Sequence, residues 1–455
     1  VIALLEDRHG DLWIGAVGGL NRYDGKELQT FTTAQGLTHD AVNYILEDRQ
    51  GDLWIATEGG LNRYDGSRFE SFTAAQGLPQ SHLVKLLEDR QGDLWMASIG
   101  GGLIRYDGSS FAALTAKDGL PNDTVHSLAE DGNGDLWVST WDSGVMRYDG
   151  ESFTQYTTRN GLGFDYVISL LVDRHGDLWL GTLGGGISCY DGEHFTNFAD
   201  GHNVSFDNVF GITEDSSGVL WLATSSGISR YDGAVFQSLL ERDGLVGNAT
   251  TAVAESRDGS FWIATRNQGV TRYRLSATPP PVRIIDVITE YRHGPVSTIA
   301  LPSTQPLVSF EFRATSFRTR PEAMLYRYRL VGRDQEWQTT RRDRVEYQDL
   351  PIGQYTFEVV AIDRDLVYST EPARVAVEIH PPYADIALWS ALGITLLAGV
   401  WLAGQIVRRN RQVRLQEARF RQVFDASLDA YIFFGEDGII ETNDAFVRMF
   451  GFESR

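Results

Sequence analysis

Short apolar runs separated by polar turns fill the first 275 residues, and their arrangement repeats along the chain. Tryptophan marks the repeat, recurring every 41 or 42 residues at Trp13, Trp54, Trp95, Trp137, Trp179, Trp221 and Trp262. Within a repeat the apolar residues show no helical period, and glycine or aspartate stands at the turns. A self-similar pattern of this length is typical of proteins in which each repeat forms one supersecondary unit.

Each repeat predicts four short strands, which in the second repeat are residues 42–46, 53–57, 60–64 and 69–72. The turn before the tryptophan has the pattern Asp-x-x-Gly, and the Asp48 carboxylate can accept hydrogen bonds from its amides. Asp65-Gly66 supplies the positive φ angles of a hairpin. Because one such sheet cannot bury both faces, the sheets must stack around an axis. We therefore expect residues 1–275 to form a seven-bladed β-propeller, with the tryptophans packed between neighbouring blades.

The fourth strand of the repeat is recognisable only six times, so the seventh blade needs an outer strand from elsewhere. It could come from residues upstream of Val1 or from Pro281–Val287. We favour the upstream residues, because propellers often close by joining the two chain ends. Since Val1 lies in mid-repeat, we interpret the sequence as a fragment and attach no weight to the missing signal peptide.

A second β domain is predicted after a proline-rich linker, residues 276–281, which we expect to act as a stiff connector. From residue 282 to residue 382, apolar and polar positions alternate in short runs separated by turns. The clearest runs are 307–312, 325–330 and 355–361. A period of two in runs of this length predicts a β-sandwich.

An uncharged stretch of about 22 residues, 386–407, is long enough to cross a hydrocarbon core of roughly 30 Å as a helix. Trp389 and Trp401 lie towards its ends, as interfacial anchors do. Arginines dominate the residues that follow it, and acids dominate those before it. By the positive-inside rule we expect residues 1–385 to be periplasmic and 408–455 cytoplasmic, in a single-pass protein of the bacterial inner membrane. A buried helix of a soluble protein is the alternative.

The carboxyl-terminal residues predict a helix and the start of an α+β domain. Residues 408–419 continue the helix and offer apolar side chains to a partner helix, in keeping with a homodimer. In 420–455 we expect strands at 430–434 and 439–441, followed by a helix capped by Asn443. Membrane lipid is the expected partner of the arginines near the span.

Charge and cysteine content narrow the functional classes. The formal net charge is −21, and residues 386–455 hold eight acids and eight arginines, so the residues before them carry the whole excess of acids. Such an acidic surface repels phosphates, and we expect no nucleic-acid partner. Cys189 is the only cysteine, which excludes an intrachain disulfide. It stands where most repeats have arginine, and we interpret it as neutral variation.

The repeat (Ile/Leu)-x-(Glu/Val)-Asp-x-x-Gly-x-Leu-Trp-(Ile/Leu)-(Gly/Ala)-Thr-x-x-Gly-(Leu/Ile)-x-Arg-Tyr-Asp resembles the two-component regulator propeller repeat. The second domain resembles the tyrosine-rich Y_Y_Y sandwich of sensor proteins through Gly332, Trp337, Tyr347, Leu350, Gly353 and Tyr355. Residues 420–455 resemble the start of a PAS domain. The resemblance implies a sensor that acts through a downstream histidine kinase and its response regulator. A diguanylate cyclase output is the alternative.

Candidate ligand-binding residues are sought where the repeats differ, in loops that open on one face of the ring. They are Glu58, Trp141, Asp142, Tyr166, Arg266, Asn267 and Gln268. Trp141 beside Asp142, facing Arg266 and Gln268 across the channel mouth, would suit a small polar molecule or an oligosaccharide. The alternative is simple variation on a solvated face.

Catalytic and metal-binding patterns are not recognisable in the sequence. It shows no Ser-His-Asp arrangement, no Cys/His spacing typical of a metal site and no P-loop, so we expect no cofactor. The Asp-x-x-Gly turn recurs in six of the seven repeats, as a structural feature does. A propeller lyase or another glycan-active enzyme is the competing hypothesis, because streptogramin lyases have similar repeats.

Overall fold

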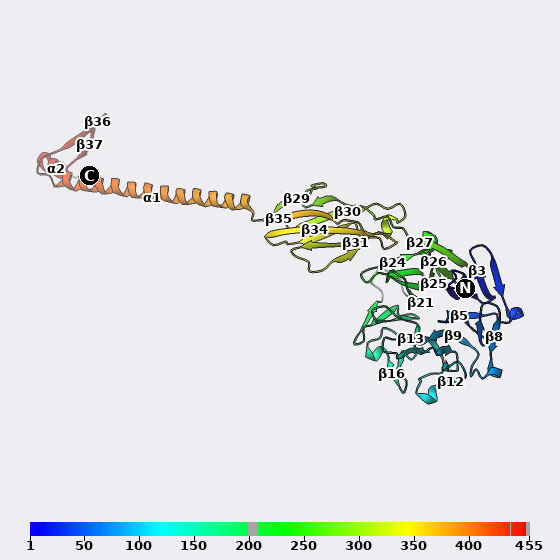
Figure 1. The fold of residues 1–455 in the computed structure, drawn as a ribbon. Coiled ribbons are helices and arrows are strands. Elements are labelled where there is room, and N and C mark those ends of the chain that lie inside the picture. Colours follow the sequence, from blue (N-terminus) through cyan, green and yellow to red (C-terminus); the bar gives the residue numbers. More distant parts are fainter. Residues whose placement is uncertain (199–207, 437, 452–455) are drawn as a thin grey trace.

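The computed structural model describes residues 1–198, 208–436 and 438–451. Figure 1 shows a ring of small sheets, a second β domain beside it, and one long helix that leads to a small carboxyl-terminal unit. The mainly β fold class expected from the sequence is confirmed.

Six four-stranded antiparallel sheets and one three-stranded sheet form the ring in the part of the chain that the structure describes. The first three sheets contain β1 (Ala3–Glu6), β2 (Leu12–Ala16), β3 (Gly19–Tyr23), β4 (Leu28–Phe31), β5 (Val42–Glu47), β6 (Leu53–Thr57), β7 (Leu61–Tyr64), β8 (Phe69–Phe72), β9 (Leu83–Glu88), β10 (Leu94–Ser98), β11 (Leu103–Tyr106) and β12 (Phe111–Leu114). The next two contain β13 (Val125–Glu130), β14 (Leu136–Thr140), β15 (Val145–Tyr148), β16 (Phe153–Tyr156), β17 (Val167–Val172), β18 (Leu178–Thr182), β19 (Ile187–Tyr190) and β20 (Phe195–Phe198). The last two contain β21 (Val209–Glu214), β22 (Leu220–Thr224), β23 (Gly227–Tyr231), β24 (Phe236–Leu239), β25 (Thr250–Glu255), β26 (Ser260–Thr265) and β27 (Gly269–Arg274). We call these sheets blades one to seven.

The aspartate of each Asp-x-x-Gly turn holds both the turn and the tryptophan. In blade two, Asp48 Oδ1 accepts hydrogen bonds from the amides of Gly51 and Asp52, each at 2.8 Å. Its other oxygen accepts one from Trp54 Nε1 at 2.8 Å. The hydrogen bonds expected within the turn are therefore present. The hydrogen bond from the tryptophan indole to the same aspartate was not predicted from the sequence. Blade seven has Ser256 at this position.

The tryptophans pack between neighbouring blades, as predicted. Trp13 of blade one, for example, belongs to a buried cluster with Val42 and Ile55 of blade two, and its ring lies 5.7 Å from that of Tyr64. The ring closes where β1 contacts β25. There, Thr251 Oγ1 donates to the Val1 carbonyl at 3.0 Å.

Blade seven contains three strands among the described residues, β25 to β27. The segment proposed as one possible fourth strand, Pro281–Val287, does not join it. Instead β28 (Val282–Ile288) pairs with a strand of the second domain. That alternative is wrong, because the proline linker turns the chain away from the ring. The other alternative, a strand from upstream residues, stays a prediction.

In the part of the chain that the structure describes, five short 3₁₀ turns, absent from the sequence prediction, follow outer strands of the blades: Thr33–Gln35, Ala74–Gln76, Ala116–Asp118, Thr158–Asn160 and Glu241–Asp243. Thr32 caps the first by accepting from the Ala34 amide, and Gln35 bonds back to the Thr32 amide. Three residues are too few to show a helical period in sequence. The capping box is the sequence feature that indicates such a turn.

The second domain is a sandwich of two sheets, in the orders β28-β30-β33 and β29-β35-β34-β31-β32. Its remaining strands are β29 (Thr298–Pro302), β30 (Leu307–Ala314), β31 (Leu325–Val331), β32 (Gln338–Thr340), β33 (Arg344–Gln348), β34 (Gly353–Ile362) and β35 (Ala373–His380), with a 3₁₀ turn at Pro321–Ala323. The three predicted strands are β30, β31 and β34. Phe310 and Phe357 stack across the two sheets with ring centroids 4.1 Å apart, both fully buried.

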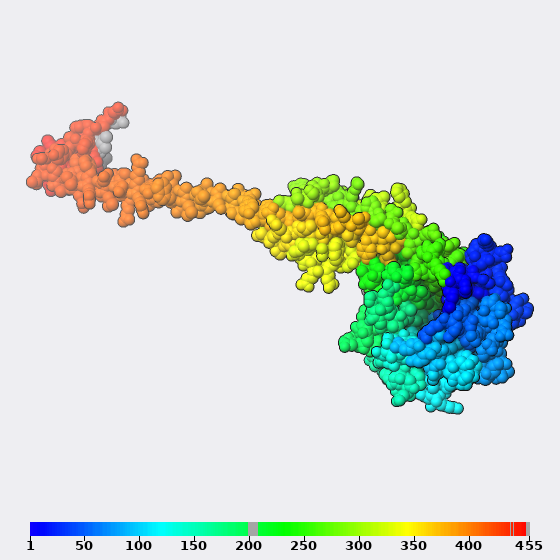
Figure 2. Space-filling model, viewed as in Figure 1, coloured from blue at the N-terminus to red at the C-terminus, as the bar shows by residue number. Residues whose placement is uncertain are grey.

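The predicted span and the helix after it form one continuous helix, α1 (Tyr383–Ala426). Figure 2 shows the middle of this helix as a narrow rod, and the end of the helix packs against the carboxyl-terminal unit, where Phe424 is buried. The apolar side chains along the rod are exposed, including Trp389 at 70% and Leu397 at 68%. It is long and apolar enough to cross a membrane.

The carboxyl-terminal unit contains β36 (Ile432–Gly435), β37 (Gly438–Thr442) and α2 (Asp444–Phe450). Asn443 caps α2 as predicted, since its side chain accepts from the Phe446 amide at 3.1 Å. Residues 452–455 of the segment predicted to start a PAS domain lie outside the described residues.

Candidate functional site

A β-bulge near the start of the innermost strand turns one side chain of each of blades two to seven towards the central channel. In β5, for example, Val42 pairs with Thr57 and Tyr44 with Ala56, so Asn43 is left unpaired. Bulges re-aim side chains in this way. The equivalent residues, all lining the channel cavity, are Asn43, Val84, His126, Ile168, Phe210 and Thr251.

In blades two to seven, the loop between the second and third strands is tied to the loop that enters the first strand. The Trp141 amide donates to the Thr124 carbonyl at 3.0 Å, and the Arg266 amide donates to the Ala249 carbonyl at 2.7 Å. The same bond forms at Glu58, Ile99, Leu183 and Ser225. Because the backbone is held identically, the blades differ at the channel mouth mainly in the side chain at this one position.

The channel contains a cavity of about 680 Å³, within the size range of small-molecule sites. Among the residues that line it are two cations, Lys85 and Arg266. The Lys85 Nζ atom lies 4.1 Å from the centre of the Tyr44 ring, and the Arg266 Cζ atom 5.0 Å from that of Phe210. Both cations thus rest on aromatic faces that point to the same space.

Trp141, Tyr166 and His126 form an aromatic group beside this cavity. The Trp141 ring lies 4.6 Å from that of Tyr166 and 5.3 Å from that of His126, and Trp141 is 47% exposed. Burial raises the pKa of Tyr166, and the nearby Asp142 carboxylate raises it further. Burial lowers the pKa of His126, whose Nε2 atom is buried without a hydrogen-bond partner. His126, which lines the cavity, therefore presents a buried ring nitrogen that no other group in the described part of the chain uses.

The structure separates the four residues expected to face one another across the mouth. Arg266 lines the cavity and Trp141 belongs to the aromatic group. Asp142 lines a different, shallow pocket on the outside of blade four. The Gln268 side chain packs against Gly247, where an added Cβ would lie 1.5 Å from its Oε1 atom.

The other predicted residues also differ in position. Asn267 lines the cavity with Arg266, and Tyr166 packs on Trp141. Glu58 is exposed and does not line the cavity. Asp142 and Asn267 have φ angles of 53° and 66° at turn positions where blades three and five have glycine. Asp and Asn tolerate this left-handed region better than most residues, which explains their presence there.

The sequence prediction missed Lys85, His126, Tyr44 and Phe210, because it sought candidates only in the loops and these residues lie in the innermost strands. A signal was available, since polar or aromatic residues replace aliphatic ones at these positions in only some blades. The bulges that turn His126 and Phe210 towards the channel cannot be read from the sequence pattern.

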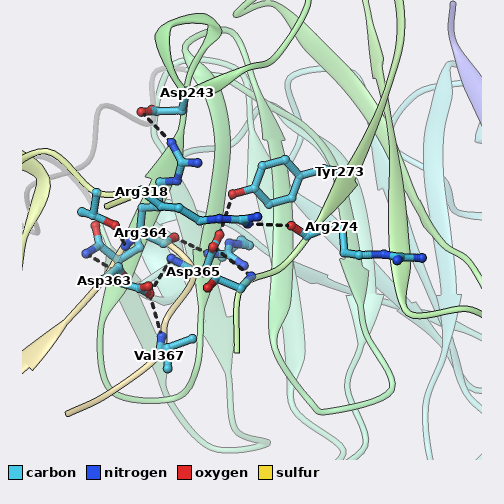
Figure 3. A network of polar contacts seen from close by, with 12 residues as sticks. Asp243, Tyr273, Arg274, Arg318, Asp363, Arg364, Asp365 and Val367 are labelled. Atoms are coloured by element: carbon cyan, nitrogen blue, oxygen red, sulfur yellow. Dashed lines mark hydrogen bonds and ion pairs between the residues drawn. The ribbon is translucent and has the colours of Figure 1, made fainter. Parts of the chain in front are cut away.

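The contact between propeller and sandwich is the second site with unusual polar chemistry, and Figure 3 shows its network. Arg230 of blade six is 1% exposed, and its Nη2 atom lies 3.8 Å from Asp365 Oδ1 of the sandwich. The same oxygen accepts a hydrogen bond from the Tyr273 hydroxyl at 2.6 Å. Asp365 Oδ2 accepts one from the Ser276 amide at 3.0 Å. One sandwich carboxylate thus joins blade six, blade seven and the linker.

Further bonds surround this carboxylate. The Gln237 side-chain amide of β24 donates to the Asp363 carbonyl at 3.1 Å and to the Ala323 carbonyl at 3.2 Å. Tyr368 donates to Asp232 at 2.7 Å. Asp243 pairs with Arg364 at 3.4 Å. Because most of these groups are buried or half-buried, the two domains are held in one relative orientation.

The linker is part of this contact. The Pro280 carbonyl accepts a hydrogen bond from Ser369 Oγ at 2.8 Å, and the Pro281 carbonyl accepts one from the Thr315 amide at 3.1 Å. The linker residues expected to form a stiff connector are therefore bonded to the sandwich as well as restricted by proline.

These features define a multidomain propeller protein with a cavity in its channel, a sandwich docked on two blades and one helix able to cross a membrane. Family models match three parts of the chain. The two component regulator propeller matches residues 36–59, 119–142 and 161–184, the Y_Y_Y domain 319–380, and a PAS domain 418–455. The chain thus contains regulator propeller repeats, a Y_Y_Y domain and a PAS segment, as the resemblance implied.

Solved structures with the same fold include extracellular domains of two-component systems. The extracellular domain of a hybrid two-component system from B. thetaiotaomicron aligns with a TM-score of 0.55 and 22% identity, over 84% of this chain and 55% of that chain. A second such domain from B. thetaiotaomicron aligns with a TM-score of 0.52 and 21% identity, over 84% of this chain and 57% of that chain. This chain therefore spans little more than half the length of either.

An enzyme shares the propeller fold. A catalytically inactive virginiamycin B lyase from Staphylococcus aureus, solved with quinupristin, aligns with a TM-score of 0.51 and 14% identity, over 60% of this chain and 94% of that chain. At such identities these likenesses show the fold alone. A comparison with curated proteins found no match.

Proposed function

We propose that this chain is the sensing and transmembrane region of a two-component-type receptor. A small molecule or oligosaccharide binds in the propeller channel, and the sandwich, α1 and the PAS segment relay its presence to a downstream histidine kinase and response regulator. The observation that carries the proposal is the uninterrupted connection from the channel to α1. The propeller is docked on the sandwich by buried polar bonds, and the sandwich ends at β35, directly before α1.

The proposed domain boundaries are those expected from the sequence. They are propeller 1–275, linker 276–281, sandwich 282–382, membrane span 386–407, signalling helix 408–419 and PAS segment 420–455. The span lies in the bacterial inner membrane, with the propeller in the periplasm and the PAS segment in the cytoplasm. Exposed apolar side chains along α1 support the span, and the arginines after residue 407 support its orientation.

The ligand site that we propose combines some of the predicted residues with others that line the channel cavity. Arg266, Asn267, Trp141 and Tyr166 come from the prediction, and Lys85, His126, Tyr44 and Phe210 are added. Asp142, Gln268 and Glu58 serve at most as outer contacts of the same mouth. A ligand changes the output only if it binds one state of the receptor better than another. A homodimer in which α1 helices pair provides two such states.

Topology mapping tests the membrane arrangement. Single cysteines at exposed positions 68 and 436, in a Cys189→Ser background, should react with an impermeant maleimide from opposite sides of the inner membrane. Labelling of both from the same side would contradict the proposal.

Signalling assays in cells that carry the whole receptor test the site. Trp141→Ala and Arg266→Ala should each reduce the ligand response while the receptor still reaches the membrane. Glu58→Ala is the matched control at the equivalent loop position, and we expect it to respond normally. Normal responses from both variants would refute the channel site. Response-regulator phosphorylation distinguishes a kinase output from cyclic di-GMP production by a cyclase.

A further inference from the structure

The lining of the channel cavity has a charge opposite to that of the protein. The chain has a net charge of −21, with 61 acids against 40 bases. Yet the described residues that line the cavity include the cations Lys85 and Arg266 and no aspartate or glutamate. The cavity lining therefore differs in charge from the rest of this acidic protein.

The two cations also lack the partners that other basic residues of the propeller have. Arg63 and Arg147 pair with carboxylates of their own blades. Within the described part of the chain, neither Lys85 nor Arg266 makes an ion pair. Each lies over an aromatic ring, Tyr44 or Phe210, a contact that orients a cation without neutralising it. Their charge is therefore available to a molecule in the cavity.

The remaining lining suits an organic molecule. Phe210, Ile168, Val84 and Leu183 contribute apolar surface, and the exposed Trp141 ring offers a stacking face beside the mouth. His126 contributes a buried Nε2 atom that has no partner within the protein. An unpaired nitrogen of this kind costs free energy unless a ligand or water bonds to it.

We infer that the channel ligand is a small organic anion, whose carboxylate or similar acidic group is held by Lys85 and Arg266. This inference rests on the proposed function and specifies the ligand class of its site. The apolar and aromatic lining contacts the body of the anion. The electrostatic attraction is strong because the cavity is partly shielded from solvent, and it weakens as salt is added.

Calorimetry on the full chain in detergent or nanodiscs tests the inference with citrate as the anion and glucose as a neutral molecule of similar size. Citrate should bind at low ionic strength, and glucose should bind more weakly. The double variant Lys85→Met/Arg266→Met should bind citrate at least about tenfold more weakly, as expected when charged hydrogen bonds are lost. The control Lys26→Met/Arg68→Met removes the same charges from exposed hairpins and should bind citrate as the unaltered chain does.

Three results would overturn the inference: no citrate binding, equal citrate binding by the double variant, or tighter binding of glucose than of citrate. Circular dichroism establishes that the double variant is folded. If a neutral sugar bound in a manner that depends on Trp141, the anion class would be wrong and the sensor proposal would stand. If neither citrate nor glucose bound and the Trp141→Ala receptor signalled normally, both would fail.

Discussion

Blades two and six share one repeat, but their equivalent arginines lie in opposite environments. Arg63 of blade two pairs with Asp52 of the same blade, and its side chain is 40% exposed. In blade six Val219 stands where blade two has Asp52, and Arg230 is buried against Asp365 of the sandwich. One substitution in the repeat thus leaves a guanidinium without its local partner and makes it the docking group for another domain.

The sandwich loop that contacts the propeller, residues 363–367, has the same hydrogen-bonded turn as the Asp-x-x-Gly turn of the blades. Asp363 Oδ1 accepts hydrogen bonds from the amides of Asp365 and Val367, as Asp48 accepts those of its own turn. Leu366 occupies the position of Gly51 with a φ of 59°, a left-handed conformation that is strained for leucine. The strain is tolerated because Leu366 packs against the buried cluster of Val235, Leu325 and Ile362 at the interface. The same local motif therefore stabilises a blade in one place and joins two domains in another.

The largest expected effect is that of Arg230→Met. It leaves Asp365 buried without its cation, and we expect the free energy of unfolding to fall by about 3 kcal/mol. Urea unfolding of the full chain in detergent, followed by tryptophan fluorescence, measures it. Arg230→Met/Asp365→Leu should recover only part of the loss, because it removes the unpaired charge but leaves the Tyr273 hydroxyl and the Ser276 amide without their acceptor. A single variant as stable as the unaltered chain would show that the pair does not hold the domains together.

Tyr273→Phe should have the next largest effect. It removes a buried hydrogen bond to a carboxylate, and we expect a loss of about 2 kcal/mol. Tyr64→Phe is the matched control, since the equivalent hydroxyl in blade two donates only to the Gly66 carbonyl. That change should cost about 0.5 kcal/mol. If the two variants lost the same free energy of unfolding, the hydrogen bond from Tyr273 to Asp365 would contribute no more than the one from Tyr64 to Gly66.

Arg63→Met should cost less than about 1 kcal/mol, because the pair that it breaks is partly exposed to solvent. Added salt should reduce even this difference. Arg230→Met should show little dependence on salt, since its pair is shielded from the solvent. Comparing the two variants by urea unfolding at low and high salt checks both expectations.

Cys189→Arg should have the smallest effect, a gain of about 0.5 kcal/mol from a restored surface pair with Asp177. Burial raises the pKa of Asp177, and the nearby Asp173 raises it further. An arginine at position 189 would lower that folded-state pKa. The gain is therefore present at neutral pH and is lost as pH falls through the range in which Asp177 takes up a proton. Unfolding at neutral and acidic pH tests this, and a gain that persists at acidic pH would contradict it.

The blade architecture was predictable because the sequence signals for its strands and turns lie within each repeat. The spacing of Trp54, the Asp48 turn and the Asp65-Gly66 hairpin are local features, and the predicted strands 53–57 and 69–72 match β6 and β8. The candidate site was predictable only in part. Arg266 and Trp141 stood out as unusual residues in a variable loop, but whether a neighbouring side chain points inward depends on the turn conformation. Gln268 packs against Gly247 and Asp142 lines a separate pocket for that reason.

The order of the domains, the repeat and the apolar span follow from residue types and spacing, since short-range hydrogen bonds and hydrophobic burial act on neighbours in the chain. The charge of the channel and the docking of the sandwich arise only when distant segments meet. Lys85 and Arg266 lie in different blades, and Arg230 and Asp365 lie in different domains. Their interactions depend on distance and burial in space, which the closing of the ring and the turn of the proline linker determine.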